Sequence, residues 1–221
     1  MPATSSNGRR GPYSKSDAVR ARILDVGVAT FGRLGYAATS TRLLAERAEV
    51  TLPAITYYFG GKEGLYRACA ADVADRFIAT TTDAARIARD MLAGRTEVAG
   101  IRTAFQNLAG SVVDAMLGAS GASRNGVFAM RELLDPGPGF DIMFERLWKP
   151  GIELIARLIA RLRGYDEVVE ADLIDAQLLL ASISAFQSGA GVATRIAPWN
   201  EIGPAQIAAV KARIAGQIER M

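Results

Sequence analysis

The sequence predicts an all-α protein in which an N-terminal three-helix helix-turn-helix domain is joined by a fourth helix to a C-terminal helical bundle. Apolar residues recur at spacings of three and four along most of the chain, and no stretch shows a convincing strand pattern. Glycine and proline residues divide this pattern into segments of helical length. The chain has 221 residues, of which 50% are hydrophobic, so it can bury a sizeable core in one large or two small domains.

The first helix is expected to begin at Ser14 and to end at Leu34, because Gly35 is a good stop signal. Val19 and Ile23 begin its apolar face. A second helix starts at the possible N-caps in residues 39–41 and runs to about residue 48. After a break at residues 49–51, a third covers about residues 52–58, with a proline near its start, and a fourth begins after two glycines and runs over about residues 62–80.

Further helices are expected near residues 82–93, 97–118, 123–134, 140–163, 167–195 and 204–220. Pro150 should kink or break the helix over residues 140–163, because proline lacks the N–H that an interior helical position needs. This pattern predicts three parts. Residues 1–13 are a disordered basic arm, residues 14–61 (to about 77 with helix four) are the helix-turn-helix domain, with the motif at 40–59, and residues 78–221 form the C-terminal helical bundle.

Composition argues against several function classes. The chain contains no histidine, which excludes Ser-His-Asp and Cys-His catalysis, and its single cysteine, Cys69, cannot form an intrachain disulfide. We expect no metal site, no cofactor and no enzymatic activity, although carboxylate or lysine chemistry stays open. The most apolar stretch, residues 174–193, is interrupted by polar residues and glycines, and the N-terminus lacks an apolar signal region, so a cytoplasmic protein is expected.

Positive charge is concentrated at one end of the chain. Residues 1–67 hold ten Lys or Arg and five Asp or Glu, whereas the remainder holds 16 basic and 18 acidic residues. Such an asymmetry is typical of a surface that binds a polyanion, and a chance distribution of surface charge is the alternative.

Residues 40–59 carry the pattern of two short helices joined by a three-residue turn. An inner face is expected from the residues Leu44, Ala45, Ala48, Val50 and Ile55. The second helix then presents small, hydroxylated and aromatic side chains, which suit base edges and phosphates in a major groove. Threonines at a helix start and a lysine at the next one suit phosphate, and Arg9, Arg10 and Lys15 could add contacts from the arm. The expected DNA-binding residues are Thr39, Thr41, Arg42, Thr51, Leu52, Ala54, Thr56, Tyr57, Tyr58 and Lys62.

Residues 17–77 resemble the TetR family of transcriptional regulators. The resemblance is most specific over residues 51–66, TLPAITYYFGGKEGLY, which is similar to the family's recognition helix running into the Phe-x-x-Lys-x-x-Leu start of helix four. Residues 23–25 and 31–36 of the first helix fit as well. The resemblance implies a dimer, two recognition helices in successive major grooves, and a C-terminal bundle over residues 78–221 that serves as the ligand-binding and dimerisation domain.

Two positions depart from the family pattern. Glu49 stands where the turn commonly has glycine, and a left-handed non-glycine residue there costs on the order of 1 kcal/mol. Thr56 stands where tyrosine is frequent, which puts the base preference in doubt and not the binding of DNA.

The C-terminal part resembles the CecR-like branch of the family, through residues 128–133 (FAMREL), residues 136–140 (PGPGF) and the interruption at Pro150. An inducer site needs a mostly apolar cavity with a few polar groups. The expected ligand-binding residues are Phe105, Phe128, Arg131, Phe144, Trp148, Gln177 and Gln187. Core packing is the alternative for the aromatic ones, and pairing with Glu132 or with helix ends is the alternative for Arg131.

The last two long helices carry more apolar residues than one bundle face requires, which suggests a helix-pair dimer interface. Its expected residues are Leu179, Ile183, Phe186, Ile207, Val210 and Ile214. The alternative is that both stripes serve only the intrachain bundle.

Together these patterns predict a ligand-released repressor that binds a palindromic operator in double-stranded DNA as a homodimer and responds to a small-molecule inducer. Helix four would transmit the change between the two conformations. An all-α enzyme and a protein-binding helical adaptor are the alternatives, and the salt dependence of DNA binding separates them from the repressor.

Overall fold

The computed structural model describes residues 13–94, 96–118, 124–188 and 190–221, and this part of the chain is helical without strands. The all-α prediction is therefore confirmed. The α-helices are α1 (Tyr13–Ala38), α2 (Thr41–Arg47), α3 (Leu52–Phe59), α4 (Lys62–Ala93), α5 (Val98–Leu117), α6 (Asn125–Leu134), α7 (Phe140–Met143), α8 (Lys149–Leu162), α9 (Glu170–Ser188), α10 (Ala190–Ile196) and α11 (Pro204–Glu219). The basic arm expected over residues 1–13, with Arg9 and Arg10, lies outside the described residues except for Tyr13.

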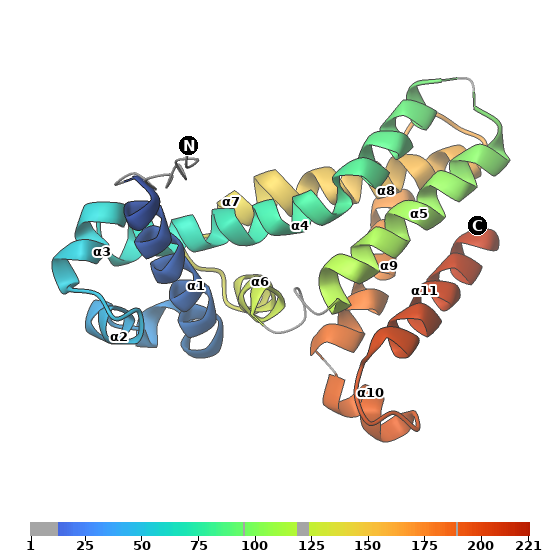
Figure 1. The fold of residues 1–221 in the computed structure, drawn as a ribbon. Helices are drawn as coiled ribbons and strands as arrows, with labels where there is room; N and C mark the ends of the chain where they lie inside the picture. Colours follow the sequence, from blue (N-terminus) through green and yellow to red (C-terminus); the bar gives the residue numbers. More distant parts are fainter. Residues whose placement is uncertain (1–12, 95, 119–123, 189) are drawn as a thin grey trace, which may run out of the picture.

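The N-terminal unit packs α1, α2, α3 and the start of α4 around one apolar core (Figure 1). Helical geometry in α1 is interrupted at Gly35, whose φ is 81°, as the stop signal predicted. Phe31 of α1, Leu44 of α2, Ile55 of α3 and Leu65 of α4 are all fully buried there. Each short helix therefore contributes an apolar side chain to a core that it could not form alone.

Helix α4 is one rod of 32 residues that runs from the N-terminal unit into the bundle (Figure 1). The helix break expected between residues 80 and 82 was wrong. The hydroxyls of Thr80 and Thr82 donate to the carbonyls of Arg76 and Ile78 in the same helix, at 3.1 and 2.7 Å. The hydroxyl groups thus find their hydrogen-bond acceptors in the preceding turn of the same helix, and the helix continues past them.

The C-terminal bundle is built around α5, which packs against α4, α8, α9 and α11. Phe105 and Val113 of α5 are fully buried, and Ile159 of α8 and Ile218 of α11 belong to the same buried cluster. Pro150 does not break the chain of helices. A π-helical turn, Phe144–Trp148, precedes it, and α8 continues to Leu162. Because the hydrogen bonds of a π-helical turn follow another spacing than those of an α-helix, the helix tolerates a proline without a backbone N–H at this point.

Helix α9 begins at Glu170, three residues later than expected, because Asp172 organises the turn before it. The Asp172 carboxylate is fully buried and accepts hydrogen bonds from Arg163 Nη1 at 2.7 Å, the Tyr165 hydroxyl at 2.9 Å and the Val169 N–H at 3.0 Å. Burial alone would raise the pKa of Asp172, but these three donors outweigh it and hold that pKa below its usual value. Within the expected helix over 167–195, the structure describes α9 to Ser188 and α10 from Ala190 to Ile196, and residue 189 lies outside the described residues.

Helix α6 connects the bundle to the N-terminal unit. Arg131 donates from Nε to the carbonyl of Gly32 at 2.8 Å and from Nη2 to that of Arg33 at 3.1 Å, at the end of α1. The Tyr66 hydroxyl of α4 donates to the buried Glu132 carboxylate. Burial raises the pKa of Glu132, and the hydrogen bond from Tyr66 opposes that rise. Arg131 thus pairs with a helix end, which was one of the alternatives left open by the sequence.

No helix among the described residues is long and apolar enough to cross a membrane.

Candidate nucleic-acid interface

The helix-turn-helix is built from α2, a sharp turn and α3. Ser40 is the N-cap of α2, and its hydroxyl accepts a hydrogen bond from the Leu43 N–H at 3.1 Å. Of the three possible caps in residues 39–41, Ser40 therefore fills this role. The Thr39 side chain is buried, and its hydroxyl donates to the Gly35 carbonyl at 2.7 Å, so it is already occupied within the chain. The Thr39 side chain is therefore not available for a contact with a DNA phosphate in this structure.

The turn between the two helices is a Schellman motif with a glutamate at the left-handed position. Glu49 has a φ of 52°, the one positive φ of a non-glycine residue in the described chain. Its N–H donates to the Glu46 carbonyl at 3.1 Å, and the Val50 N–H donates to the Ala45 carbonyl at 3.0 Å. Arg22 of α1 donates to the Glu49 carbonyl at 3.4 Å from outside the motif. The sequence left the conformation of Glu49 open, and the structure shows that it is left-handed.

The predicted inner face is confirmed. Leu44, Ala45, Ala48 and Ile55 are buried, and Val50 is half-buried against the same core. This packing fixes which side of α3 can reach a ligand.

The opposite side of α3 is open to solvent. Thr51, Leu52 and Thr56 are exposed, and Tyr57 keeps 82% of its surface accessible. Thr51 makes no side-chain capping bond at the start of α3, so capping does not occupy its hydroxyl. Ala54 is half-buried.

A shallow surface groove runs along this face. Its lining residues are Thr41, Leu52, Pro53, Thr56 and Tyr57. Four of them belong to the predicted DNA-binding set, and the structure brings them together. Pro53 was not among the expected DNA-binding residues, because a proline near the start of a helix is explained by its role in helix initiation alone. Tyr58 lies beside this face, half-buried, with its hydroxyl hydrogen-bonded to that of Ser16 at 3.1 Å.

Two of the expected phosphate-binding cations lie on the helices before and after α3. Arg42 is exposed on α2. Lys62 begins α4, and its ammonium lies 4.3 Å from the centre of the Tyr36 ring. In the sequence, Tyr36 stands out only as part of the family resemblance. A contact between residues 26 positions apart leaves no signal in a single sequence.

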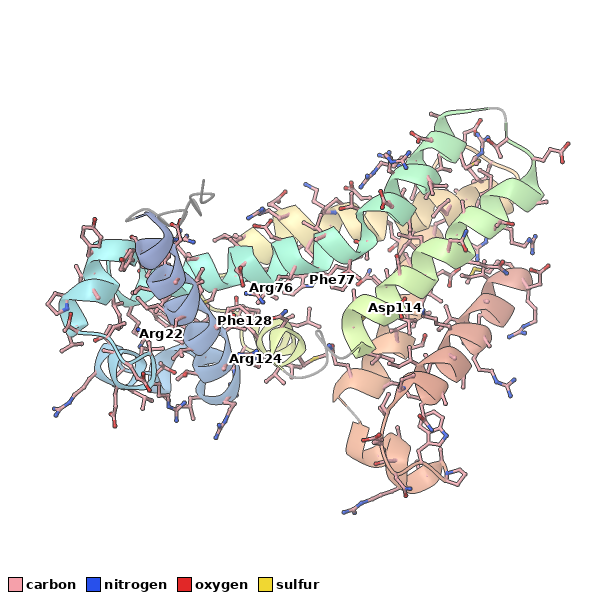
Figure 2. All side chains as sticks on the ribbon, viewed as in Figure 1. Arg22, Arg76, Phe77, Asp114, Arg124 and Phe128 are labelled. Carbon is pink, nitrogen blue, oxygen red and sulfur yellow. The ribbon has the colours of Figure 1, made fainter. Side chains whose placement is uncertain are left out.

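The expected ligand-binding residues do not converge on one cavity. Phe105 fills the bundle core and Phe128 fills the N-terminal core, both fully buried, and Phe128 lies where α6 meets α1 (Figure 2). Gln177 donates to the Leu173 carbonyl of its own helix at 3.4 Å, and Gln187 donates to the Met116 carbonyl at 2.9 Å.

Two of the expected ligand residues do form an aromatic group on the π-helical turn. Phe144 is 39% exposed, and its ring stacks on Phe140 with centroids 6.1 Å apart. Trp148 lies 5.4 Å from the same Phe140 ring.

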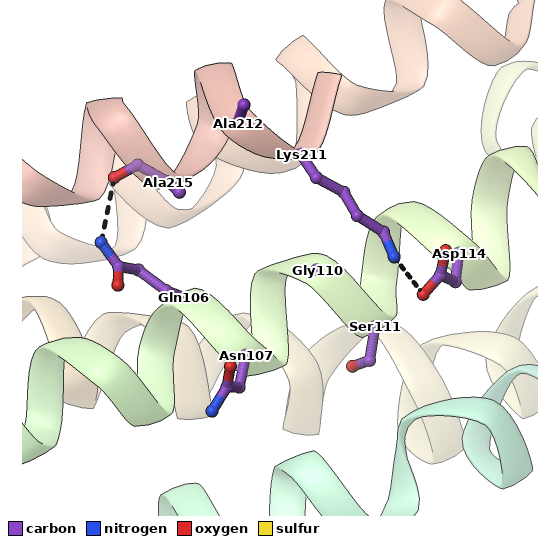
Figure 3. A pocket seen from close by; sticks show the side chains of 8 residues that line it. All are labelled: Gln106, Asn107, Gly110, Ser111, Asp114, Lys211, Ala212 and Ala215. Carbon is purple, nitrogen blue, oxygen red and sulfur yellow. Dashed lines mark hydrogen bonds and ion pairs between the residues drawn. The ribbon is translucent and has the colours of Figure 1, made fainter. Parts of the chain in front are cut away.

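A second surface hollow lies between α5 and α11 (Figure 3). Lys211 and Asp114 form an ion pair across it at 2.5 Å, and Gln106 donates to the Ala215 carbonyl at 3.3 Å. None of the expected ligand-binding residues lines it.

The residues expected at a dimer interface mostly face the chain's own core. Leu179, Ile183, Val210 and Ile214 are at most 4% exposed, and Phe186 and Ile207 pack partly buried against the same cluster. The structure therefore favours the alternative that these stripes serve the intrachain bundle. On the outward side of α9, Ile174 and Leu178 are instead 49% and 61% exposed.

Both halves of the chain are similar to known regulators. Residues 23–69 match the family described as "Bacterial regulatory proteins, tetR family", and residues 101–221 match the C-terminal domain of the HTH-type transcriptional dual regulator CecR. The chain is 30% identical over 179 residues to CecR of Shigella flexneri, covering 79% of this chain and 78% of that protein.

Among solved structures, a TetR-like transcriptional regulator from Rhodococcus sp. RHA1 superposes with a TM-score of 0.62 at 20% identity, over 90% of this chain and 94% of that one. A complex of SmeT with triclosan superposes with a TM-score of 0.55 at 19% identity, over 81% and 83% of the two chains. The helix-turn-helix, the two family matches and the CecR relative agree that this chain belongs to the TetR family of DNA-binding transcriptional regulators, with a C-terminal domain of the CecR type.

Proposed function

We propose that this chain is a ligand-released repressor that acts in the cytoplasm as a homodimer on a palindromic operator, without catalytic activity. The observation that carries the proposal is the solvent-open face of α3, which presents Thr56 and Tyr57 beside the exposed Arg42 and the Lys62 ammonium. Short hydroxylated side chains can approach base edges, and cations at the margin can meet the phosphates on either side.

The direct test is the selection of bound sites from a random DNA library. We expect a palindrome whose half-sites are one helical turn apart, about 34–36 Å, because two recognition helices of a symmetric dimer enter successive major grooves. Thr56→Ala and Tyr57→Phe should change the selected bases, whereas Lys62→Ala should weaken all sequences alike. Lys149→Ala is the matched control, since this lysine pairs with Glu145 on the bundle surface. Recovery of no enriched sequence would contradict the proposal.

Salt dependence separates this function from an enzyme or a protein-binding adaptor. DNA affinity should fall steeply between about 50 and 200 mM salt, because each phosphate contact releases a counterion. A flat response would contradict DNA binding through this surface. Since the relative in Shigella flexneri is named a dual regulator, the reporter assay should score activation as well as repression.

We propose the outward face of α9 as part of the dimer interface, in place of the buried stripe. Ile174, Leu178, Ala181 and Ala185 follow each other at spacings of three and four on this face, and all four are exposed. An exposed apolar row of this kind suits an isologous contact between two copies of a chain.

Leu178→Glu should convert the dimer to a monomer in sedimentation velocity and lower the operator affinity accordingly. Leu134→Glu places the same charge on another exposed leucine, on α6, and should leave the dimer intact. A dimer that survives Leu178→Glu would exclude this face as the interface.

We propose that an apolar ligand acts through the aromatic group of Phe140, Phe144 and Trp148. SmeT, which shares the fold of this chain, forms a complex with triclosan, and this supports an apolar ligand here. A Trp199→Phe variant leaves Trp148 as the single tryptophan, so saturable quenching of its fluorescence by triclosan would report binding near this group. Fluorescence that triclosan leaves unchanged would count against this group as its site.

Ligand release requires different affinities of the ligand for two conformations. We expect the separation of the two α3 helices to differ between ligand-bound and DNA-bound crystals. Equal separations would refute this mechanism.

A further inference from the structure

Lys62 is held over an aromatic ring instead of extending freely into solvent. Its ammonium lies 4.3 Å from the centre of the Tyr36 ring, within the range of a cation–π contact. A free lysine side chain loses much rotamer freedom when it is fixed on a phosphate. The Tyr36 ring already restricts that freedom in the unbound protein, so less is lost on binding.

The Tyr36 ring is itself held by a buried aromatic cluster. The Tyr36 and Tyr66 rings form a T-shaped pair with centroids 5.0 Å apart and an interplanar angle of 76°. The Tyr66 ring lies 5.1 Å from that of Phe128 of α6, and the Tyr66 hydroxyl donates to Glu132 of the same helix. A continuous chain of contacts therefore leads from α6 through two tyrosines to the ammonium of Lys62.

A second contact from α6 fixes the backbone that carries Tyr36. Arg131 donates to the carbonyls of Gly32 and Arg33, and its guanidinium lies against Gly35, the residue before Tyr36. At Gly32, a Cβ atom would come within 3.2 Å of the Phe128 backbone nitrogen, so α1 and α6 are in close contact there.

We infer that Tyr36 is a positioning residue for the Lys62 phosphate contact. Helix α6 holds Tyr36 in place through its own Arg131 and through its contacts with Tyr66 of α4. This inference rests on the proposed function and deepens it, because it names how the bundle reaches a DNA contact without moving a base-reading side chain. A displacement of α6 would weaken phosphate binding at Lys62 and leave the base preference of α3 unchanged.

The test is a double-mutant cycle on the full-length protein. The probes are a fluorescein-labelled duplex of unrelated sequence and a duplex from the library selection, each titrated from about 50 to 200 mM salt. Tyr36→Leu should lower the affinity for both duplexes about two- to fivefold, because the freed lysine side chain must then lose its rotamer freedom on binding. Tyr36→Phe keeps the ring and should bind like the wild type. Lys62→Ala should reduce the salt slope by about one phosphate.

The decisive comparison is made in the Lys62→Ala background. There, Tyr36→Leu and Arg131→Gln should cause no further loss, because the group that they position is absent. Losses that multiply with that of Lys62→Ala, or a Tyr36→Phe protein as weak as Tyr36→Leu, would overturn the inference. Thermal melts check that each variant is folded, and Tyr36→Met replaces Tyr36→Leu in the same cycle if the latter is not.

The failure of the proposed function has a different signature. A wild-type protein that binds neither duplex with a salt-dependent affinity would refute DNA binding through this surface itself. Salt-dependent wild-type binding combined with multiplying losses would refute only the role of Tyr36.

Discussion

Replacing Glu49 by glycine should stabilise the protein. Glu49 occupies the left-handed position of the turn between α2 and α3 with a φ of 52°, where a side chain clashes with its own backbone. The hydrogen bonds of the turn involve only main-chain N–H and carbonyl groups of residues 45–50, and the Arg22 contact uses the Glu49 carbonyl. Glu49→Gly therefore removes the strain and leaves every one of these bonds in place.

The size of the effect follows from two opposing terms. A left-handed non-glycine residue costs about 1–2 kcal/mol in the folded state. Glycine also has more conformational freedom in the unfolded chain, which offsets about 0.4–1 kcal/mol of the stabilisation. The net gain in the free energy of unfolding is about 0.5–1 kcal/mol, which corresponds to an increase in Tm of about 1–4 °C for a chain of this length.

The assay is urea unfolding followed by circular dichroism, together with thermal melts at equal protein concentration. Glu49→Ala is the control, because it removes the same carboxylate and keeps a Cβ atom at the left-handed position. We expect the alanine variant to stay near the wild type. If Glu49→Ala raised stability as much as Glu49→Gly, charge and not backbone strain would be the cause, and the reasoning would be refuted.

Two other predictions concern stability. Asp172→Ala should cost about 1–3 kcal/mol, because it leaves the Tyr165 hydroxyl and the Val169 N–H without their buried acceptor, while Arg163 keeps its ion pair with Asp175. Because folding lowers the pKa of Asp172, its ionised carboxylate stabilises the folded protein at every pH above the unfolded pKa of about 3.9. This stabilisation is lost as the pH falls from there through the folded pKa. The difference in the free energy of unfolding between wild type and variant, measured in urea, should therefore shrink over that pH range. An unchanged difference at low pH would contradict this. Gly27→Ala should destabilise the protein by about 1–3 kcal/mol, because its Cβ would lie 2.7 Å from Cys69 Sγ, whereas Gly110→Ala on α5, with open space around it, should stabilise by up to about 1 kcal/mol. Equal shifts in Tm for these two alanines would show that close packing at Gly27 is not what separates them.

Local signals predicted the N-terminal unit well because each of them has a local physical cause. Gly35 ends the straight part of α1 since glycine adopts a positive φ readily, and Gly60 ends α3 in the same way. The inner face of α2 and α3 followed from the helical period. The helix expected to end at about residue 80 continues through three threonines at residues 80–82, because their hydroxyls bond to carbonyls of the preceding turn.

The site was only partly accessible to the same reasoning. Periodicity located the open face of α3, since a short helix with one buried side leaves the other exposed. It could not tell that Thr39 is buried, because a threonine beside an N-cap has the same pattern whether its hydroxyl meets a backbone carbonyl or a phosphate. For α9, the sequence showed more apolar residues than one bundle face requires, and only the tertiary structure shows that Leu179 is covered while Leu178 is open.

The largest difference between expectation and structure concerns how the two parts of the chain communicate. The sequence suggested helix four as the connection, and α4 does pass through both parts as one rod of 32 residues, about 48 Å long. However, α6 also binds the N-terminal unit directly, through Arg131 on the end of α1 and Glu132 on Tyr66. A change in the bundle therefore has two routes to the helix-turn-helix, and a rotation of α4 alone would break the hydrogen bond between Tyr66 and Glu132 of α6. A ligand that moves α6 together with α4 keeps that hydrogen bond. The contacts of α6 therefore determine by how much the ligand must bind one conformation more tightly than the other.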